Sequence, residues 1–356
     1  HKDTTVNDDP ERERGRFRWR LGAETKIIDD VKVGFGLGSG SASSATSTSG
    51  TTGDPRSTEQ TLDSSFSKKP VIIDYAFAQY TPLKWLSLSG GKLKTNPIFR
   101  ANSLGFWASE LVWDNDITPE GAAVVLNYPA LLNLDTIKFD VFMNNAFFIL
   151  DENNPSNSGR EPYMYVIQPG FNLKIMEDIN FKAALAKYLF SGIEHKSQLK
   201  FSANSNTLVG GNYKFKYDAW IGTAEFGFNN PFSQNIVPYV GLFGEYILNP
   251  DPDNENKAYI GGIRVGYPSL KKFGDWQLIY AYRRLEKDAW LDIFPDSTFY
   301  SGATNSKGHK ASIYFGLAKN LFCDLNYFHA VNILDNSSSP KKRPEDVLQV
   351  DIQFNF

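Results

Sequence analysis

The sequence has little of the residues on which several protein classes depend. Cys323 is its one cysteine, which excludes an internal disulfide framework and a cysteine cluster for zinc. It has only four histidines, none in a metal-ligand spacing, and no nucleophile motif accompanies them. A net charge of -3 gives no reason to expect nucleic acid as a partner. The sequence therefore predicts no catalytic residue, no metal site and no cofactor.

Long hydrophobic runs are also absent. No apolar run approaches the roughly 18 residues that a membrane helix needs. Aromatic residues, in contrast, make up 14% of the chain, with 27 Phe and 17 Tyr, although the mean hydropathy is -0.36. That combination suits a lipid-facing belt around a polar interior. If the chain crosses a membrane, strands must do so, because only helices and closed barrels satisfy their backbone groups in lipid.

The C-terminal segment from Asp346 to Phe356 alternates apolar and polar side chains without interruption. One face carries Leu348, Val350, Ile352, Phe354 and Phe356, and the other carries Gln349, Asp351, Gln353 and Asn355. A strand of about ten residues with one apolar and one polar face is typical of a transmembrane barrel, although the edge strand of a soluble sandwich shows the same period. The terminal Phe356 resembles the C-terminal signature of bacterial outer-membrane proteins, which the barrel-assembly machinery reads, and we predict it as the assembly signal.

The first alternating segment places three arginines on one face. Phe17, Trp19 and Leu21 share the opposite face, and the three basic residues are Arg16, Arg18 and Arg20. Each arginine pointed at mid-bilayer lipid costs about 2–4 kcal/mol, so three would cost on the order of 6–12 kcal/mol. We therefore predict that they face the lumen. There they either line the passage or form a structural ladder with acidic neighbours such as Glu24 or Asp351.

Connections between the predicted strands alternate between short and long. The short ones lie near 29–30, 81–83, 176–180, 229–235, 268–274 and 318–320, and the long ones at 39–69, 91–118, 190–212, 286–308 and 333–345. Outer-membrane barrels have short periplasmic turns and longer extracellular loops, whereas a soluble sandwich has no reason to sort its loops so strictly. The pattern therefore predicts an all-β fold, a transmembrane antiparallel β-barrel with long extracellular loops.

The strand count is about fifteen, which is odd where bacterial single-chain barrels are even. The first and last visible strands also run in the same direction, since each leads toward the periplasm. We therefore expect one further strand before residue 1, which gives about sixteen. Residues 1–13 would be the remnant of an extracellular loop or a disordered lead, and residues 14–356 the barrel. A barrel of this size leaves an aqueous channel.

Residues 211–229 change their apolar phase within one predicted strand. Tyr217, Ala219 and Ile221 alternate with charged residues, but the apolar positions then shift to Phe226 and Phe228. A bulge near Gly222 would explain the shift.

Several motifs of the first third of the chain carry a family resemblance. They are Arg16 to Lys26, Asp29 to Leu37, Asp54 to Thr58, Thr61 to Asp63, Ser67 to Pro70, Gly90 to Lys92 and Leu111 to Gly121. With them the chain resembles the "putative porin" family of Gram-negative outer membranes. The resemblance implies a water-filled diffusion channel. The partners we expect are outer-membrane lipid and lipopolysaccharide, the barrel-assembly machinery and small hydrophilic solutes, with a homotrimer as a candidate assembly.

The long segment 91–118 contains the strongest candidates for a constriction, because one long loop of a porin folds inward and sets charges of both signs across the lumen. The alternative is a loop lying outside over the barrel mouth. Beside the arginines already named, the candidate pore-lining residues are Lys92, Lys94, Arg100, Asp114, Asp116, Glu120, Arg264 and Arg283.

Passive diffusion of small hydrophilic solutes and ions is the function that these features favour, with a weak preference for anions. The preference rests on the excess of basic over acidic residues on the predicted lumen faces, which include Lys32, Lys138, Lys182, Lys214 and Lys216 against Asp140, Asp218, Asp324 and Asp351. One alternative is a substrate-selective channel, for which a slide of lumen aromatics would be the sign. Others are a barrel enzyme using His309 or His329 at the rim, an adhesin, and a soluble β-sandwich lectin.

Overall fold

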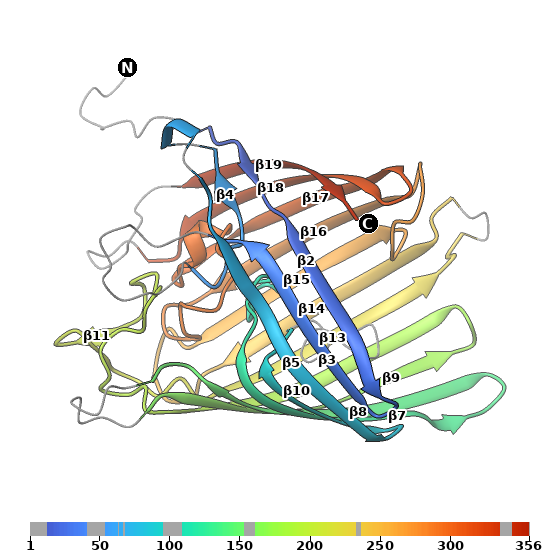
Figure 1. Cartoon of the computed structure of the whole chain (residues 1–356), viewed down its shortest axis with the longest axis horizontal. Helices are drawn as coiled ribbons and strands as arrows, with labels where there is room; N and C mark the ends of the chain where they lie inside the picture. The colour runs from blue at the N-terminus through green and yellow to red at the C-terminus, as the bar shows by residue number, and fades with distance from the viewer. Residues whose placement is uncertain are drawn as a thin grey trace.

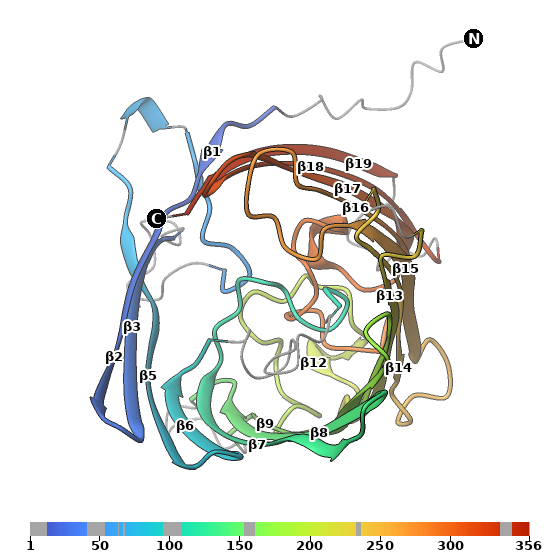
Figure 2. The ribbon, with the colours of Figure 1, turned by 90° about the vertical axis from the view of Figure 1, so that its right-hand side faces the viewer.

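The computed structural model describes residues 13–40, 54–62, 64–66, 68–94, 109–152, 161–232, 236–334 and 344–355. Fifteen strands of this part of the chain form one antiparallel sheet, in the order β19-β18-β17-β16-β15-β14-β13-β10-β9-β8-β7-β6-β5-β3-β2. The sheet curves into a barrel, seen from the side in Figure 1 and along its axis in Figure 2. The predicted all-β antiparallel barrel and its count of about fifteen visible strands are confirmed. Within the described ranges, no helix is long and apolar enough to cross a membrane.

The strands are about ten residues long, as a membrane-spanning barrel requires. Their bounds are β2 (Arg20–Ile28), β3 (Val31–Ser39), β5 (Val71–Leu83), β6 (Leu86–Lys92), β7 (Glu120–Asn133), β8 (Ile137–Ile149), β9 (Tyr163–Ile175), β10 (Ile179–Ser191), β13 (Ala219–Asn229), β14 (Tyr239–Leu248), β15 (Lys257–Gly266), β16 (Trp276–Leu285), β17 (Ser306–Ala318), β18 (Leu321–Asn332) and β19 (Glu345–Phe354). Two short pairs lie outside this sheet: β1 (Arg16–Phe17) with β4 (Gln60–Thr61), and β11 (Leu208–Val209) with β12 (Asn212–Tyr213). The first alternating segment, which carries the three arginines, is therefore divided, and only its second part joins the barrel.

The connections sort by length between the two ends of the barrel. Tight turns such as Asp29–Asp30 and Lys319–Asn320 lie at one end, and the long connections lie at the other (Figure 1). The side chains sort between the two faces. Leu348, Val350 and Ile352 of β19 point outward and are each more than half exposed, as the alternation predicted. In the bilayer this exposed apolar surface is the lipid-facing belt.

Strand β13 is regular where the sequence predicted a bulge. Its pairing with β10 and with β14 runs without a register shift, and the strand begins only at Ala219. Ala219 and Ile221 point inward and are buried, whereas Phe226 points outward. The apolar phase therefore changes because the inward side chains at the long-loop end of β13 pack against apolar residues inside the barrel. The predicted bulge at Gly222 is wrong.

Strands β2 and β19 are the two edges of the sheet. Among the described residues, no backbone pairing joins them. β2 leads into the short turn at Asp29–Asp30, and Phe354 of β19 pairs with Leu321, which follows another short turn. Both edges therefore run toward the short-turn end, so a direct pairing would be parallel. The further strand expected between them stays a prediction.

Candidate channel constriction

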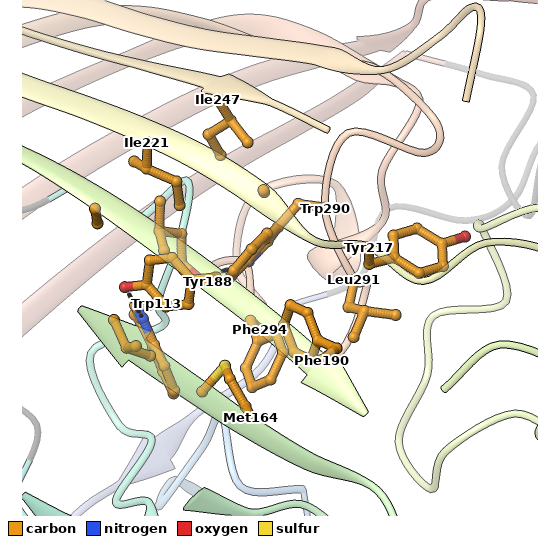
Figure 3. Close-up of a cluster of buried hydrophobic side chains, with 14 of the residues drawn as sticks. Trp113, Met164, Tyr188, Phe190, Tyr217, Ile221, Ile247, Trp290, Leu291 and Phe294 are labelled. Atoms are coloured by element: carbon orange, nitrogen blue, oxygen red, sulfur yellow. Dashed lines mark hydrogen bonds between the residues drawn. The ribbon is translucent and has the colours of Figure 1, made fainter. Parts of the chain in front are cut away.

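A plug of two connecting segments, residues 109–119 and 286–305, lies within the ring of strands. Residues 193–217 lie at the long-loop end (Figure 1), and several of their apolar side chains belong to the same core. The two plug segments lie far apart in the sequence, yet they share one apolar core. Figure 3 shows this core, in which aromatic rings from the plug meet inward-facing side chains of β9, β10, β13 and β14. We call residues 109–119 and 286–305 the luminal plug.

Two tryptophans join the halves of the luminal plug to each other and to the wall. The Trp290 ring lies 4.9 Å from that of Tyr188 on β10, edge to face, and the Trp113 ring lies 4.8 Å from that of Phe294. Trp290 Nε1 donates to Val112 O at 2.9 Å, and Trp113 Nε1 donates to Tyr188 OH at 3.1 Å. Buried indoles need such acceptors, because an unpaired N–H would offset the gain from burying the ring.

Aspartates spaced four residues apart fix the backbone of the second plug segment. Asp288 accepts hydrogen bonds from Tyr217 OH and Thr207 N, each at 2.8 Å. Asp292 accepts from Ser202 Oγ at 2.9 Å and from Ser205 N at 2.8 Å. Burial raises the pKa of Asp292, since the charged form loses its hydration. The third member of the series is Asp296, which accepts from Thr298 N at 2.9 Å.

Asp114 holds the two plug segments together. Its carboxylate accepts from Ser297 N at 2.8 Å and from Asp116 N at 2.9 Å, and it is almost fully buried. Burial and, after it, the nearby Asp296 raise the pKa of Asp114 to about 8. Asp114, which was predicted as a pore-lining residue, lies at this contact between the two plug segments, and its role in the lumen stays a prediction.

Asp116 faces the predicted arginines. Arg20 Nη2 lies 2.7 Å from Asp116 Oδ1, and Arg18 Nη1 lies 3.2 Å from the same oxygen. Arg20 also contacts Asp74 Oδ2 at 3.3 Å and donates to Thr58 Oγ1 at 2.9 Å. The structure therefore brings together Arg18, Arg20 and Asp116, residues that lie almost 100 positions apart. Arg16 pairs with Glu59, and so the acidic partners of the arginines differ from the predicted Glu24 and Asp351.

A second charged cluster lies beside the first on the inner face of β2 and β3. Glu24 forms ion pairs with Lys94 and with Lys32, the latter at 3.1 Å, and Lys94 Nζ lies 4.1 Å from the centre of the Tyr75 ring. The Tyr75 ring lies flat against the wall, because the position beneath it is Gly36, where a Cβ would stand 2.2 Å from the ring. Together the two clusters give one part of the wall a polar, charged inner face.

The remaining predicted pore residues lie elsewhere. Arg264 points inward but is buried against Glu225 and Tyr239, and Arg283 is buried with its guanidinium 3.9 Å from the Phe299 ring centre. Lys92 and Glu120 form a cross-strand ion pair at 3.0 Å, on the same outward face as Leu88 and at the long-loop end. The candidates Arg100 and Phe356 lie outside the described residues.

Histidines of the barrel strands lie on the outer face. His309 Nδ1 is 2.7 Å from Tyr280 OH, and His329 Nδ1 is 2.9 Å from Asp346 Oδ1. Their neighbours on the same face include Tyr282 and Tyr327. In the described part of the chain no group of three or more His, Cys, Asp or Glu residues could hold a metal ion.

Sequence reasoning missed Asp74, Asp292 and Trp290. The sequence did contain a signal for the last two. The long segment 286–308 carries several large aromatic residues, which are usually buried, and an Asp at every fourth position, a pattern that is unusual for an exposed loop. Asp74 gave no signal, because it belongs to an alternating strand in which any polar residue fits.

Comparison with known proteins identifies the fold and the family. OprB of Pseudomonas putida is 12% identical, with 96% of this chain and 88% of that chain covered and a TM-score of 0.53. Wzi of Escherichia coli, described as a carbohydrate-binding outer-membrane β-barrel involved in group 1 capsule assembly, is 12% identical, with 95% and 71% covered and a TM-score of 0.51. The outer-membrane channel DcaP of Acinetobacter baumannii is 14% identical, with 94% and 83% covered and a TM-score of 0.45.

At these identities the similarity to OprB and Wzi shows a shared barrel fold alone. No curated protein matches the chain. The family described as "Putative porin" matches residues 1–221 and 223–356, far beyond the first third in which the resemblance was found from the sequence. The chain therefore belongs to the "Putative porin" family and is an integral β-barrel channel of the outer membrane.

Proposed function

We propose that the protein conducts small hydrophilic solutes and ions by passive diffusion, along the part of the lumen bounded by β2, β3 and β17–β19. The inner faces of these strands are polar. Their inward side chains include Glu24, Lys32, Ser312, Tyr314, Asp324, Asn326, Gln349, Asp351 and Gln353. Such a surface favours water, whereas the opposite side of the lumen is occupied by the apolar core of the luminal plug.

The proposed constriction lies where Asp116 of the plug meets Arg18 and Arg20. An inward loop that carries an acid opposite basic residues narrows the lumen and sets a transverse field, which selects solutes by charge and width. Lys94 and Glu24 extend this charged region along the wall.

The proposed weak preference for anions rests on unequal exposure within these ion pairs, and this observation carries the proposal. The side chains of Arg18 and Arg20 are 38% and 39% exposed, whereas that of Asp116 is 9% exposed. The side chains of Lys32 and Lys94 are likewise more exposed than that of their partner Glu24. A solute in the passage therefore meets the cationic member of each pair first, and fixed positive charge raises the local concentration of anions.

Reversal potentials in a salt gradient test both parts of this proposal. We expect the wild-type channel to favour chloride over potassium, and the double substitution Arg18→Gln with Arg20→Gln to lower that permeability ratio by at least about twofold at low salt. Asp116→Asn should change the ratio in the opposite direction. Lys257→Gln is the matched control, since Lys257 lies on the outer face. A wild-type conductance near zero would refute the diffusion channel, and a cation preference would refute the selectivity alone.

We also propose that the protein forms a homotrimer, contacts lipopolysaccharide and is inserted by the barrel-assembly machinery. Each of these is consistent with an outer-membrane barrel that has a broad apolar belt. Cross-linking in native membranes separates monomer from trimer, and Phe356→Asp tests the assembly signal by the yield of heat-modifiable, membrane-inserted protein.

A further inference from the structure

The barrel wall has a notch at its long-loop end, between the start of β5 and the end of β8. The last pairing of β5 with β6 is Ala76 with Lys92, and Lys92 in turn faces Glu120, the first residue of β7. β5 continues five residues further, to Val71, and there it pairs with β3 alone among the described strands. β6 and β7 therefore end together at the Lys92–Glu120 pair, five residues short of the end of β5.

A cavity of about 800 Å³ lies in this notch. On its outer side it is lined by Val71, Ile73 and Ile149, each more than half exposed. These residues belong to the lipid-facing surface, because Ile73 continues the row formed by Leu37 of β3 and its neighbour Leu21 of β2.

The inner side of the cavity belongs to the lumen. Trp113, Asp116 and Phe294 of the luminal plug line it there. A space lined by lipid-facing side chains at one end and by plug residues at the other passes through the wall. Its volume falls within the range of about 300–1,000 Å³ that small-molecule sites occupy.

The chemistry of the lining changes from one end to the other. Aliphatic side chains form the outer end, and the Lys92–Glu120 ion pair lies on the same outward face, at the edge of the wall. At the inner end, the carboxylates of Asp74 and Asp116 share Arg20. An apolar molecule would leave these ion pairs without compensation, and a fully hydrated solute would gain nothing from the aliphatic end.

We propose that this notch is a lateral binding site for an amphipathic molecule taken from the outer leaflet, with a single apolar chain and a head group that carries charges of both signs. The chain lies against Val71, Ile73 and Ile149, in continuity with lipid. The head group reaches Lys92 and the carboxylates of Asp74 and Asp116. The site shares Asp116 with the proposed constriction, but binding there does not require ions to cross the lumen, so the two proposals can fail separately.

Tryptophan quenching tests the proposal on the full chain in lipid nanodiscs, with a bromine-labelled alkylphosphocholine as the probe. The contribution of Trp113 is the difference between the wild type and Trp113→Phe. Trp113 is buried and lines the cavity, so only a probe within the notch contacts it. We expect the probe to quench that contribution, and Thr118→Phe, which fills the cavity, to prevent the quenching.

Two other tryptophans serve as matched controls. Trp220 faces lipid on β13 and should be quenched in every variant, which verifies that the probe has entered the disc. Trp290 is buried in the plug away from the cavity lining and should stay unquenched. Loss of the Trp220 signal without loss of the Trp113 signal would overturn the proposal. Quenching of both buried tryptophans, unaffected by Thr118→Phe, would also overturn it, because the probe would then penetrate the plug in general.

Discussion

The inner faces of two parts of the barrel wall differ in what they contact. On β8–β10 and β13–β16, which we call the plug wall, the inward side chains near the long-loop end are apolar and buried; they include Phe148, Met164, Ile221, Ile247 and Leu285. On β2, β3 and β17–β19, which we call the open wall, the inward side chains are charged, amide or hydroxyl groups, as in the row of Gln349, Asp351 and Gln353.

This difference shows what the inward side of a barrel strand encodes. The outward side carries exposed apolar residues on strands all round the barrel, because lipid surrounds the whole belt. The inward side takes the polarity of whatever fills the lumen next to it. Strands that are apolar on both faces, such as the upper part of β13, therefore indicate a lumen packed with protein rather than with water.

Removal of a plug tryptophan should give the largest difference between the two walls. Trp290→Ala deletes the ring that joins Tyr188, Phe190 and Phe294, and a buried Trp→Ala substitution costs about 3–5 kcal/mol. We expect the luminal plug to unfold within an intact barrel, so that conductance rises and protease cleaves within residues 286–305. Single-channel recording and limited proteolysis measure these two changes.

Trp220→Ala is the control for that experiment, since the same residue type faces lipid from β13. It should leave conductance and protease resistance near wild type. If Trp290→Ala also left both unchanged, the plug would not depend on its aromatic core.

Substitution of one buried and one partly buried carboxylate should give the next largest difference between the two walls, in the free energy of unfolding. Glu225 of the plug wall binds Arg264 and accepts from Tyr239 OH, with both partners largely buried. Glu225→Gln leaves the Arg264 cation in a dry site without its counter-charge, which costs about 3–5 kcal/mol. Asp351→Asn of the open wall should cost less than about 1 kcal/mol, because its side chain is only partly buried. Denaturant unfolding of the inserted barrel measures both, and equal costs would contradict a wet open wall.

Much of the barrel could be predicted from the sequence, because a membrane imposes a simple rule on each strand. The two-residue period of β19 and the cost of arginine in lipid are enough to orient Val350 and Arg20 correctly. Loop lengths are enough to sort the two ends of the barrel, since turns and extracellular loops differ in length.

The plug could not be predicted in the same way. Its contacts join residues far apart, such as Trp290 with Val112 and Arg18 with Asp116, and no local period records them. For the same reason the acidic residues of 114–120 could be grouped as constriction candidates but not assigned to individual positions. Asp114 lies at the contact between the two plug segments, Asp116 faces the arginines, and Glu120 lies on the outer face. The phase change in β13 was visible, but without the plug it suggested a bulge.

The pH dependence of the plug should be the smallest of these effects when it is expressed per pH unit. Asp114 has an ordinary pKa of 3.8, which burial and Asp296 raise to about 8 in the folded protein. Between these values the folded plug binds one more proton than the unfolded plug, so its stability falls as pH rises, by at most about 1.4 kcal/mol per pH unit. Asp114→Asn retains an oxygen that accepts from Ser297 N but cannot titrate, so it should flatten the slope. Hydrogen exchange of residues 109–119 between about pH 5 and about pH 8, corrected for intrinsic rates, measures the slope. An unchanged slope in Asp114→Asn would assign it to Asp296 instead, whose pKa burial also raises.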